Sequence, residues 1–98
     1  TPLPPSRRAP VKDELHASPI GEVGVRRLIK RGLLKIVTQE QADRILGNVP
    51  ESEIEARYSE DGKRIEGFYL NGTLHLIDGN IEKGQVYPVL LHETGHKY

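Results

Sequence analysis

Three residues near the end of the chain, His92, Glu93 and His96, have the types and the spacing of a hydrolytic metal site. Histidines four positions apart on a helix lie on one face, about 5–6 Å apart at Cβ, so both imidazoles can reach one metal ion. Glu93 lies roughly 100° around the helix, where its carboxylate can take a proton from a metal-bound water. We therefore predict that His92 and His96 bind Zn²⁺ and that Glu93 is the catalytic base.

The residues before this motif predict the helix that carries it. The helix should run from about Gln85 past His96, with Pro88 in its first turn, where the missing N–H costs little. Its apolar surface would come from Val86, Val89, Leu90 and Leu91. Gly95 costs a helix about 1 kcal/mol relative to alanine, so we expect a reason for it, such as the close approach of a sheet.

A β-hairpin is predicted upstream, around the dipeptide Asn71-Gly72. This dipeptide between two β-rich runs is the strongest short-range signal for a hairpin. A two-residue turn would pair Leu70 with Thr73, Tyr69 with Leu74, and Phe68 with His75. One face would carry Ile65, Tyr69, Leu74 and Leu76, and the other Phe68, Leu70, His75 and Ile77. Because both faces are apolar, we expect part of each to be covered.

The segment from Ser18 to Gly32 has the pattern of an amphipathic helix. Ser18 suits the N-cap, Pro19 the first helical position and Gly32 the C-cap. One face carries Val25, Leu28 and Ile29, and the opposite face carries Arg26, Arg27, Lys30 and Arg31. The basic face could grip a phosphate backbone, but a charged solvent face is favoured because no aromatic residues interleave with it.

A strand and a second helix are predicted next. Leu33–Val37 reads as a short buried strand, and Thr38 with Gln41 forms a capping-box pattern that opens a helix ending at Gly47. The acidic stretch that follows is loop-like, although Ile54–Tyr58 could form a strand.

Composition limits the classes of protein to consider. The chain has 98 residues, enough for one small domain, and its 14 acidic residues balance 14 basic ones. Zero net charge gives no general attraction to nucleic acid, which disfavours a nucleic-acid partner. No cysteine is present, which excludes disulfides and thiolate metal sites. No apolar run approaches the roughly 20 residues of a membrane span, so we expect no membrane partner.

The first 17 residues predict a flexible arm. Four of the seven prolines fall within residues 1–12, and proline disfavours both helix interiors and central strands. A solvated tail is the simplest interpretation, with a docking or cleavage segment as the alternative. We expect the folded domain to cover residues 18–98.

Residues 65–96 resemble the zincin-like metallopeptidase domains of phage and mobile-element polyvalent proteins, and in outline the compact minimal zincins. The resemblance is carried by LHLIDGNI and VLLHETGH, and more weakly by GVRRLIKRGLLKIV upstream. It implies that His92 and His96 are zinc ligands and Glu93 the general base. It also implies that the hairpin contributes an edge strand beside the cleft, to which an extended peptide substrate could add.

The third zinc ligand is the open question. In zincins it normally follows the helix, but only Lys97 and Tyr98 remain after His96. The ligand could lie on a missing C-terminal segment of a longer parent polypeptide, which we favour because the sequence ends abruptly and lacks methionine. It could come from within the chain, from His75, Asp78 or His16, although His75 is more simply a strand residue and Asp78 a turn residue. Alternatively, the domain no longer hydrolyses anything.

Together these observations predict a small α+β domain of zincin-like architecture, with N-terminal helices, a small sheet and a C-terminal active-site helix. The predicted function is zinc-dependent hydrolysis of a peptide or protein substrate. The alternatives are a non-catalytic structural or interaction domain of a larger phage or secreted protein, and a nucleic-acid-binding module that uses the Arg26–Arg31 helix face. The resemblance favours the bacterial cytoplasm or a phage particle, with secretion left open.

Overall fold

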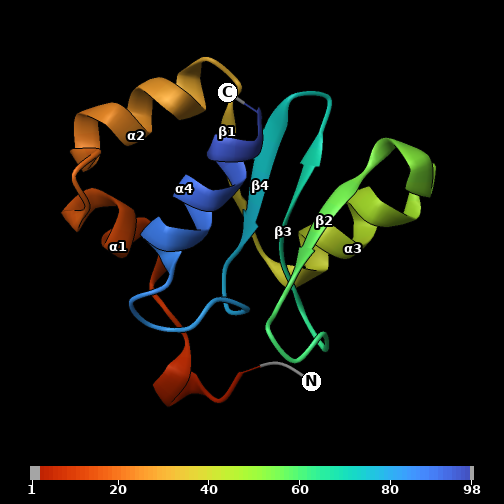
Figure 1. Ribbon diagram of the computed structural model, residues 1–98, viewed down its shortest axis with the longest axis horizontal. Helices are drawn as coiled ribbons and strands as arrows, with labels where there is room; N and C mark the ends of the chain where they lie inside the picture. Colours follow the sequence, from red (N-terminus) through yellow and green to blue (C-terminus); the bar gives the residue numbers. More distant parts are fainter. Residues whose placement is uncertain (1–2, 98) are drawn as a thin grey trace.

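A four-stranded mixed sheet lies between two layers of helices (Figure 1). The computed structural model describes residues 3–97, and side chains as far as Thr94. The strands are β1 (Leu34–Val37), β2 (Glu55–Tyr58), β3 (Ile65–Leu70) and β4 (Thr73–Ile77). Their order in space is β1-β4-β3-β2; β1 runs parallel to β4 and the other neighbours are antiparallel. The predicted α+β class is therefore confirmed.

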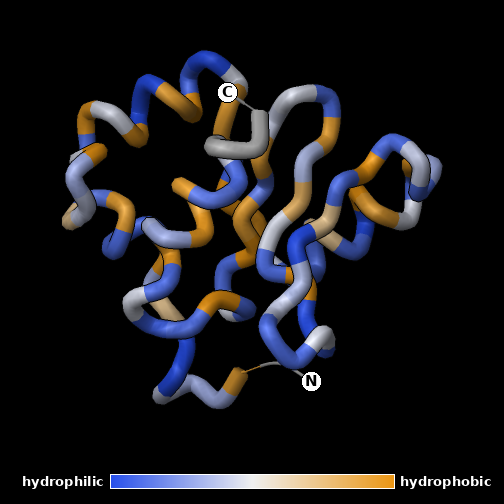
Figure 2. Tube along the Cα trace, viewed as in Figure 1, coloured by the Kyte–Doolittle hydropathy of each residue, from blue (hydrophilic) through white to orange (hydrophobic). Residues whose placement is uncertain are grey.

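The helices divide unequally between the two faces of the sheet. Helices α1 (Val11–Ala17), α2 (Gly21–Lys30) and α4 (Val86–Lys97) cover one face, here called the α4 face. Helix α3 (Gln39–Gly47) covers the other, here called the α3 face. Two short 3₁₀ turns, Pro5–Arg7 and Glu51–Glu53, complete the described elements. In Figure 2 hydrophobic segments of these helices turn toward the sheet, which places one core on each side of it.

The hairpin between β3 and β4 has the predicted register. Leu70 lies opposite Thr73, Tyr69 opposite Leu74, and Phe68 opposite His75. Asn71 and Gly72 have φ angles of 53° and 80°, the left-handed pair that a two-residue turn of type I′ requires. Asparagine and glycine adopt this conformation at low cost, which explains why the dipeptide fixes the register.

One predicted face assignment in the hairpin is wrong. Ile65 was expected on the face of Tyr69, but it packs with Phe68 on the α3 face. The pairing of β2 with β3 shifts here: Arg57 lies opposite Gly67, but the next residue, Tyr58, lies opposite Ile65. Glu66 is therefore an extra residue in β3, and such a bulge reverses the alternation of side chains beyond it. A Cβ on Gly67 would lie 2.8 Å from the carbonyl oxygen of His75, so the strands can approach closely only at a glycine.

The predicted strand and helix at residues 33–47 are confirmed. Strand β1 begins one residue later than expected, and helix α3 begins with the full capping box. The Thr38 hydroxyl accepts a hydrogen bond from the Gln41 N–H at 3.1 Å, and the Gln41 side chain accepts one from the Thr38 N–H at 3.0 Å. Within the stretch that the sequence left undecided, Glu55–Tyr58 forms β2, an edge strand. The expectation that the hairpin contributes an edge strand is wrong, because β3 and β4 each have a neighbouring strand on both sides.

Helix α2 also follows its predicted pattern, with two differences. Gly32 and Leu33 close its C-terminus by donating to the carbonyls of Ile29 and Leu28. The helix begins at Gly21 rather than beside Ser18, whose hydroxyl instead accepts a hydrogen bond from the N–H of Ile20. Four basic residues face solvent as expected, namely Arg26, Arg27, Lys30 and Arg31, but Ile29 is also exposed.

The segment expected to be a flexible arm is part of the folded domain from Leu3 onward. Helix α1 begins directly after Pro10, and its Val11 and Leu15 are fully buried against the core of the α4 face. Because these two residues are four apart, one turn of helix brings both to the same side. The preceding backbone also pairs with the segment before α4: the Ala9 N–H donates to the Ile81 carbonyl. The prolines are confined to the turn before the helix, where they do not interrupt it.

Candidate active site

Helix α4 carries the HETGH motif on a continuous run of helical backbone. It spans Val86–Lys97, within a residue of the predicted start, and Pro88 lies in its first turn as expected. Val86, Val89 and Leu90 are buried against the sheet, whereas Leu91, which was expected to join them, is 51% exposed. The buried residues fix the rotation of the helix, so they determine which way the residues of the motif point.

His92 and His96 lie one turn apart on this helix, as a two-histidine metal site requires. The imidazole of His92 is at the surface of α4. The side chain of His96 and the surroundings of Gly95 lie outside the described residues. The backbone geometry and the ligand type therefore fit the predicted pair of zinc ligands.

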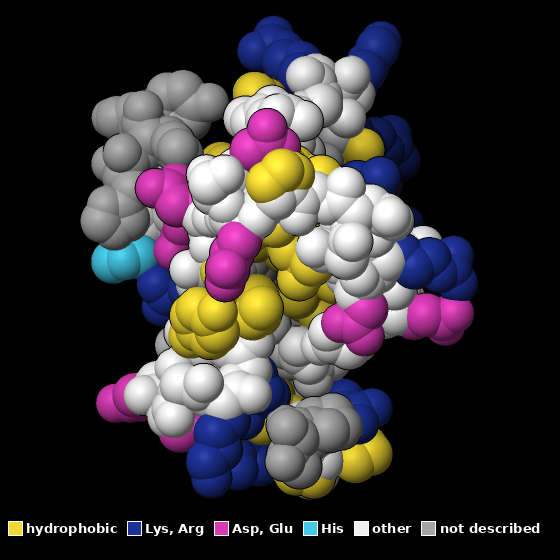
Figure 3. Space-filling model, turned by 90° about the vertical axis from the view of Figure 1, so that its right-hand side faces the viewer, with side chains coloured by type: hydrophobic (Ala, Val, Ile, Leu, Met, Phe, Trp, Pro, Cys, Tyr) yellow, Lys and Arg dark blue, Asp and Glu magenta, His cyan; other side chains and the backbone are white. Residues whose placement is uncertain are grey.

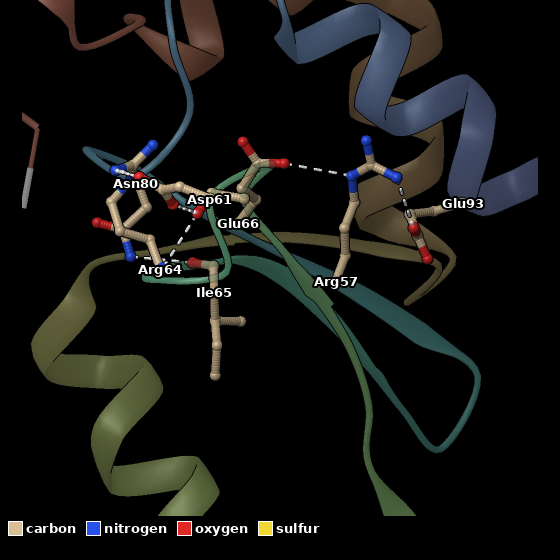
Figure 4. A network of polar contacts seen from close by, with 8 residues as sticks. Arg57, Asp61, Arg64, Ile65, Glu66, Asn80 and Glu93 are labelled. Atoms are coloured by element: carbon tan, nitrogen blue, oxygen red, sulfur yellow. Dashed lines mark hydrogen bonds and ion pairs between the residues drawn. The ribbon is translucent and has the colours of Figure 1, made fainter.

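Glu93 points from helix α4 toward the edge strand β2. Its side chain is only 14% exposed, and its Oε1 lies 3.4 Å from Nη1 of Arg57. The guanidinium of Arg57 contacts a second carboxylate as well, since its Nε lies 3.3 Å from Oε1 of Glu66. Figure 4 shows Arg57 between the two acids. We call Glu66, Arg57 and Glu93 the arginine bridge; it links β3, β2 and α4.

The bulge in β3 explains why the arginine bridge can form. Arg57 lies opposite Gly67, which has no side chain to obstruct the guanidinium. The extra residue at the bulge is Glu66, and its carboxylate reaches Arg57 above the same face. Burial raises the pKa of Glu66, and the hydrogen bond and positive charge of Arg57 oppose that rise. A buried carboxylate of this kind needs its partner, because an unpaired charge away from water is costly.

A polar cavity of about 750 Å³ opens beside the arginine bridge. Arg57 and Glu66 form part of its wall, and Val89 of α4 and Gln85, directly before that helix, form another part. The loop from Ser59 to Arg64 closes the far end, where the hydroxyl of Ser59 donates to the Asp61 carboxylate and lowers the pKa of Asp61. The cavity therefore extends from Arg57 and Glu66 of the arginine bridge along the end of β2, and Glu93 is not among its lining residues.

His75 does not belong to this site. Its side chain is buried, with the whole residue 6% exposed, and its ring stacks on Phe68 with centroids 4.6 Å apart. Both rings lie on the α3 face, whereas His92 is on α4 across the sheet. Burial lowers the pKa of His75, which favours the neutral ring that packs here. His75 is therefore a strand residue, as the simpler interpretation held, and it cannot complete a metal site on α4.

The other internal candidates do not complete a metal site either. Asp78 is an exposed residue directly after β4, and His16 is half-buried on α1. Among the residues that the structure describes, no three His, Asp or Glu side chains are grouped so that they could hold a metal ion. The described side chains therefore provide no third ligand for the predicted zinc site.

Two further surfaces bear on the alternative functions. On α2 the exposed Arg26 pairs with Glu22 of the same helix, which partly neutralises the basic face. On the α3 face an apolar hollow of about 460 Å³ lies between α3 and β2, lined by Leu46, Ile54 and Tyr58 among others. Figure 3 views this side and shows hydrophobic side chains gathered among acidic ones. Within residues 3–97, no helix is both long enough and apolar enough to cross a membrane.

Sequence reasoning identified the motif but missed the residues that surround it. Arg57 and Glu66 lie in stretches that carry no motif, and neither is near α4 along the chain. The only signal was Gly67 inside a predicted strand, which often marks a bulge or a close backbone approach.

Comparisons with models of protein families, with curated proteins and with solved structures find no match to this chain.

Proposed function

We propose that this chain carries the catalytic helix of a zinc-dependent peptidase. The observation that carries the proposal is Glu93, which adjoins His92 on a continuous helix and is turned into the structure beside an edge strand. A glutamate in the second position of this motif is the group that takes a proton from water in metal-assisted peptide hydrolysis. The resemblance to zincin-like domains supports the same assignment.

In this proposal each element has a distinct task. His92 and His96 would hold the zinc ion, which when bound supplies an activated water and polarises the carbonyl under attack. Glu93 would accept the proton of the water and deliver it to the leaving amine. The edge strand β2 would offer its free backbone edge to an extended peptide, which would then lie along β2 on the side away from β3.

A non-catalytic interaction domain is the second candidate. It is favoured by the lack of a three-ligand group among the described side chains and by the ion pair that already occupies Glu93. Such a domain would keep the fold and the arginine bridge without hydrolysing peptides.

Zinc stoichiometry and hydrolysis of an unstructured peptide library together decide between these candidates. We expect about one zinc per wild-type chain, and loss of that zinc in the double variant His92→Ala, His96→Ala. The variant Glu93→Gln should keep the zinc and lose hydrolysis, because only the proton acceptor is removed. His16→Ala, which removes a histidine outside α4, is the control and should keep both. A Glu93→Gln chain as active as wild type would reject the peptidase. A wild-type chain that binds no zinc would reject peptidase activity of this chain by itself, in favour of the non-catalytic domain, and would leave the activity only to a longer parent polypeptide.

A further inference from the structure

We infer that Arg57 is a positioning residue, which holds the Glu93 carboxylate on the β2 side of helix α4 and is itself held by Glu66. The inference rests on the proposed peptidase function, because it assigns Arg57 a task in that reaction. Neither the HETGH motif nor the resemblance assigns any role to Arg57 or Glu66.

The first argument is the placement of the ion pair. Arg57 and Glu93 are 36 residues apart, and their contact joins the edge strand to the proposed catalytic helix. A glutamate on a helix has several rotamers, and a charge-assisted hydrogen bond selects one of them. The selected rotamer points Glu93 toward the strand to which a peptide substrate would add.

The second argument is how the pair uses the carboxylate. Arg57 contacts Oε1 of Glu93, so among the contacts of the described residues Oε2 is the oxygen left to accept a proton from water. The contact of 3.4 Å is longer than the roughly 2.7–2.9 Å of a tight charge-assisted bond. Catalytic hydrogen bonds are often long before substrate binds and shorten in the reactive complex. The arginine bridge can therefore orient Glu93 while leaving one oxygen for chemistry.

The third argument is the support behind Arg57. A guanidinium on a flexible side chain orients a partner only if it is itself fixed. Glu66 provides this second contact, at 3.3 Å to Nε, and its own side chain is 11% exposed. The Arg57 side chain is 29% exposed, so solvent screens the bridge only in part.

Steady-state kinetics test the positioning role. We expect Arg57→Gln to lower kcat at least tenfold with KM changed less than twofold, because a misdirected base impairs the reaction but not the binding of substrate. Arg57→Lys should recover part of the loss, since it keeps the charge, and Glu66→Gln should lower kcat by a smaller factor. Arg44→Gln breaks an exposed ion pair with Glu40 on the far face and serves as the control. An Arg57→Gln chain with wild-type kcat would overturn the inference.

A double-mutant cycle on the metal-free chain tests the ion pair without any activity. Unfolding equilibria of Arg57→Gln, Glu93→Gln and the double variant should show coupling of threefold or more. The matched cycle on Arg44 and Glu40, whose side chains are 70% and 77% exposed, should show less than about twofold. Coupling at Arg57 no greater than this control would overturn the inference.

The two sets of results separate failure of the inference from failure of the proposed function. If Glu93→Gln is inactive and Arg57→Gln retains wild-type kcat, the inference alone is rejected. If Glu93→Gln keeps wild-type activity, the proposed function is rejected and the positioning role is rejected with it, even where the cycle detects the ion pair.

Discussion

The two faces of the sheet use the same kinds of residue for different purposes. On the α3 face a histidine and a phenylalanine stack inside a small core, and the polar ring of His75 is shielded from water. On the α4 face three helices build a larger core, and at its β2 edge the apolar packing gives way to the charged arginine bridge. The contrast shows that a residue type alone does not identify a site, because burial and neighbours determine what a histidine or a glutamate can do.

Truncation of Leu15 should have the largest effect on the α4 face, because this side chain packs helix α1 into the core there. Leu15 is fully buried, so Leu15→Ala should lower the free energy of unfolding by about 2–5 kcal/mol. Chemical denaturation of the whole chain measures this change. Lys12→Ala, an exposed change on the same helix, should cost less than about 0.5 kcal/mol. Equal costs for the two variants would mean that α1 does not pack and that the flexible arm was the better description.

The pH dependence of the free energy of unfolding tests whether His75 is buried as a neutral ring on the α3 face. Folding lowers the pKa of His75, so the unfolded chain binds the proton more readily than the folded chain does. The contribution of His75 to the free energy of unfolding is therefore fully present above its ordinary pKa of 6.5. It should be lost as pH falls below that value, by less than about 1.4 kcal/mol per pH unit because one proton is involved.

Comparison with His75→Phe isolates this contribution, since the variant keeps an aromatic pair with Phe68 and removes the titration. The comparison of the two chains is needed because Glu66 changes stability in the opposite direction. Its raised pKa makes its contribution to the free energy of unfolding weaken as pH rises above about 4.5. Both chains retain Glu66, so its effect cancels. Parallel stability curves for the two chains between pH 4.5 and 8 would show that burial of His75 does not shift its protonation.

The capping box of α3 offers the smallest test, confined to the α3 face. Thr38→Ala removes the hydroxyl that accepts from Gln41 and should cost about 1 kcal/mol in the free energy of unfolding. Thr38→Ser keeps the hydroxyl and should recover most of this loss in the same denaturation experiment. If serine and alanine destabilise equally, the cap contributes through its methyl group and not through its hydrogen bond.

Local signals predicted most of the elements but not their partners. The turn at Asn71-Gly72 and the capping box at Thr38 are each determined by residues within four positions, and both are confirmed. Helix α1 was missed because prolines dominate the composition around it, although Val11 and Leu15 have helical spacing. Ile65 was placed on the wrong face because one extra residue in β3 reverses the alternation, and that bulge depends on pairing with β2.

For the candidate site, the sequence predicted the helix and its motif but not what surrounds them. Glu93 meets Arg57 only because α4 packs across the sheet at a certain rotation, which the distant core residues decide. No periodicity or motif in 98 residues encodes such a contact between separate elements. The zinc ligands and the peptidase activity remain predictions for the experiments above.

The pairing of residues 7–9 with residues 81–83 has a consequence for the way the chain folds during synthesis. Helices α1 and α2 leave the ribosome before β4 and α4, which cover their apolar sides. The core of the α4 face therefore stays incomplete until the segment from β4 to α4 has been made. We expect the domain to fold as a unit only after α4 has emerged, with the apolar surface of the earlier helices accessible to chaperones until then.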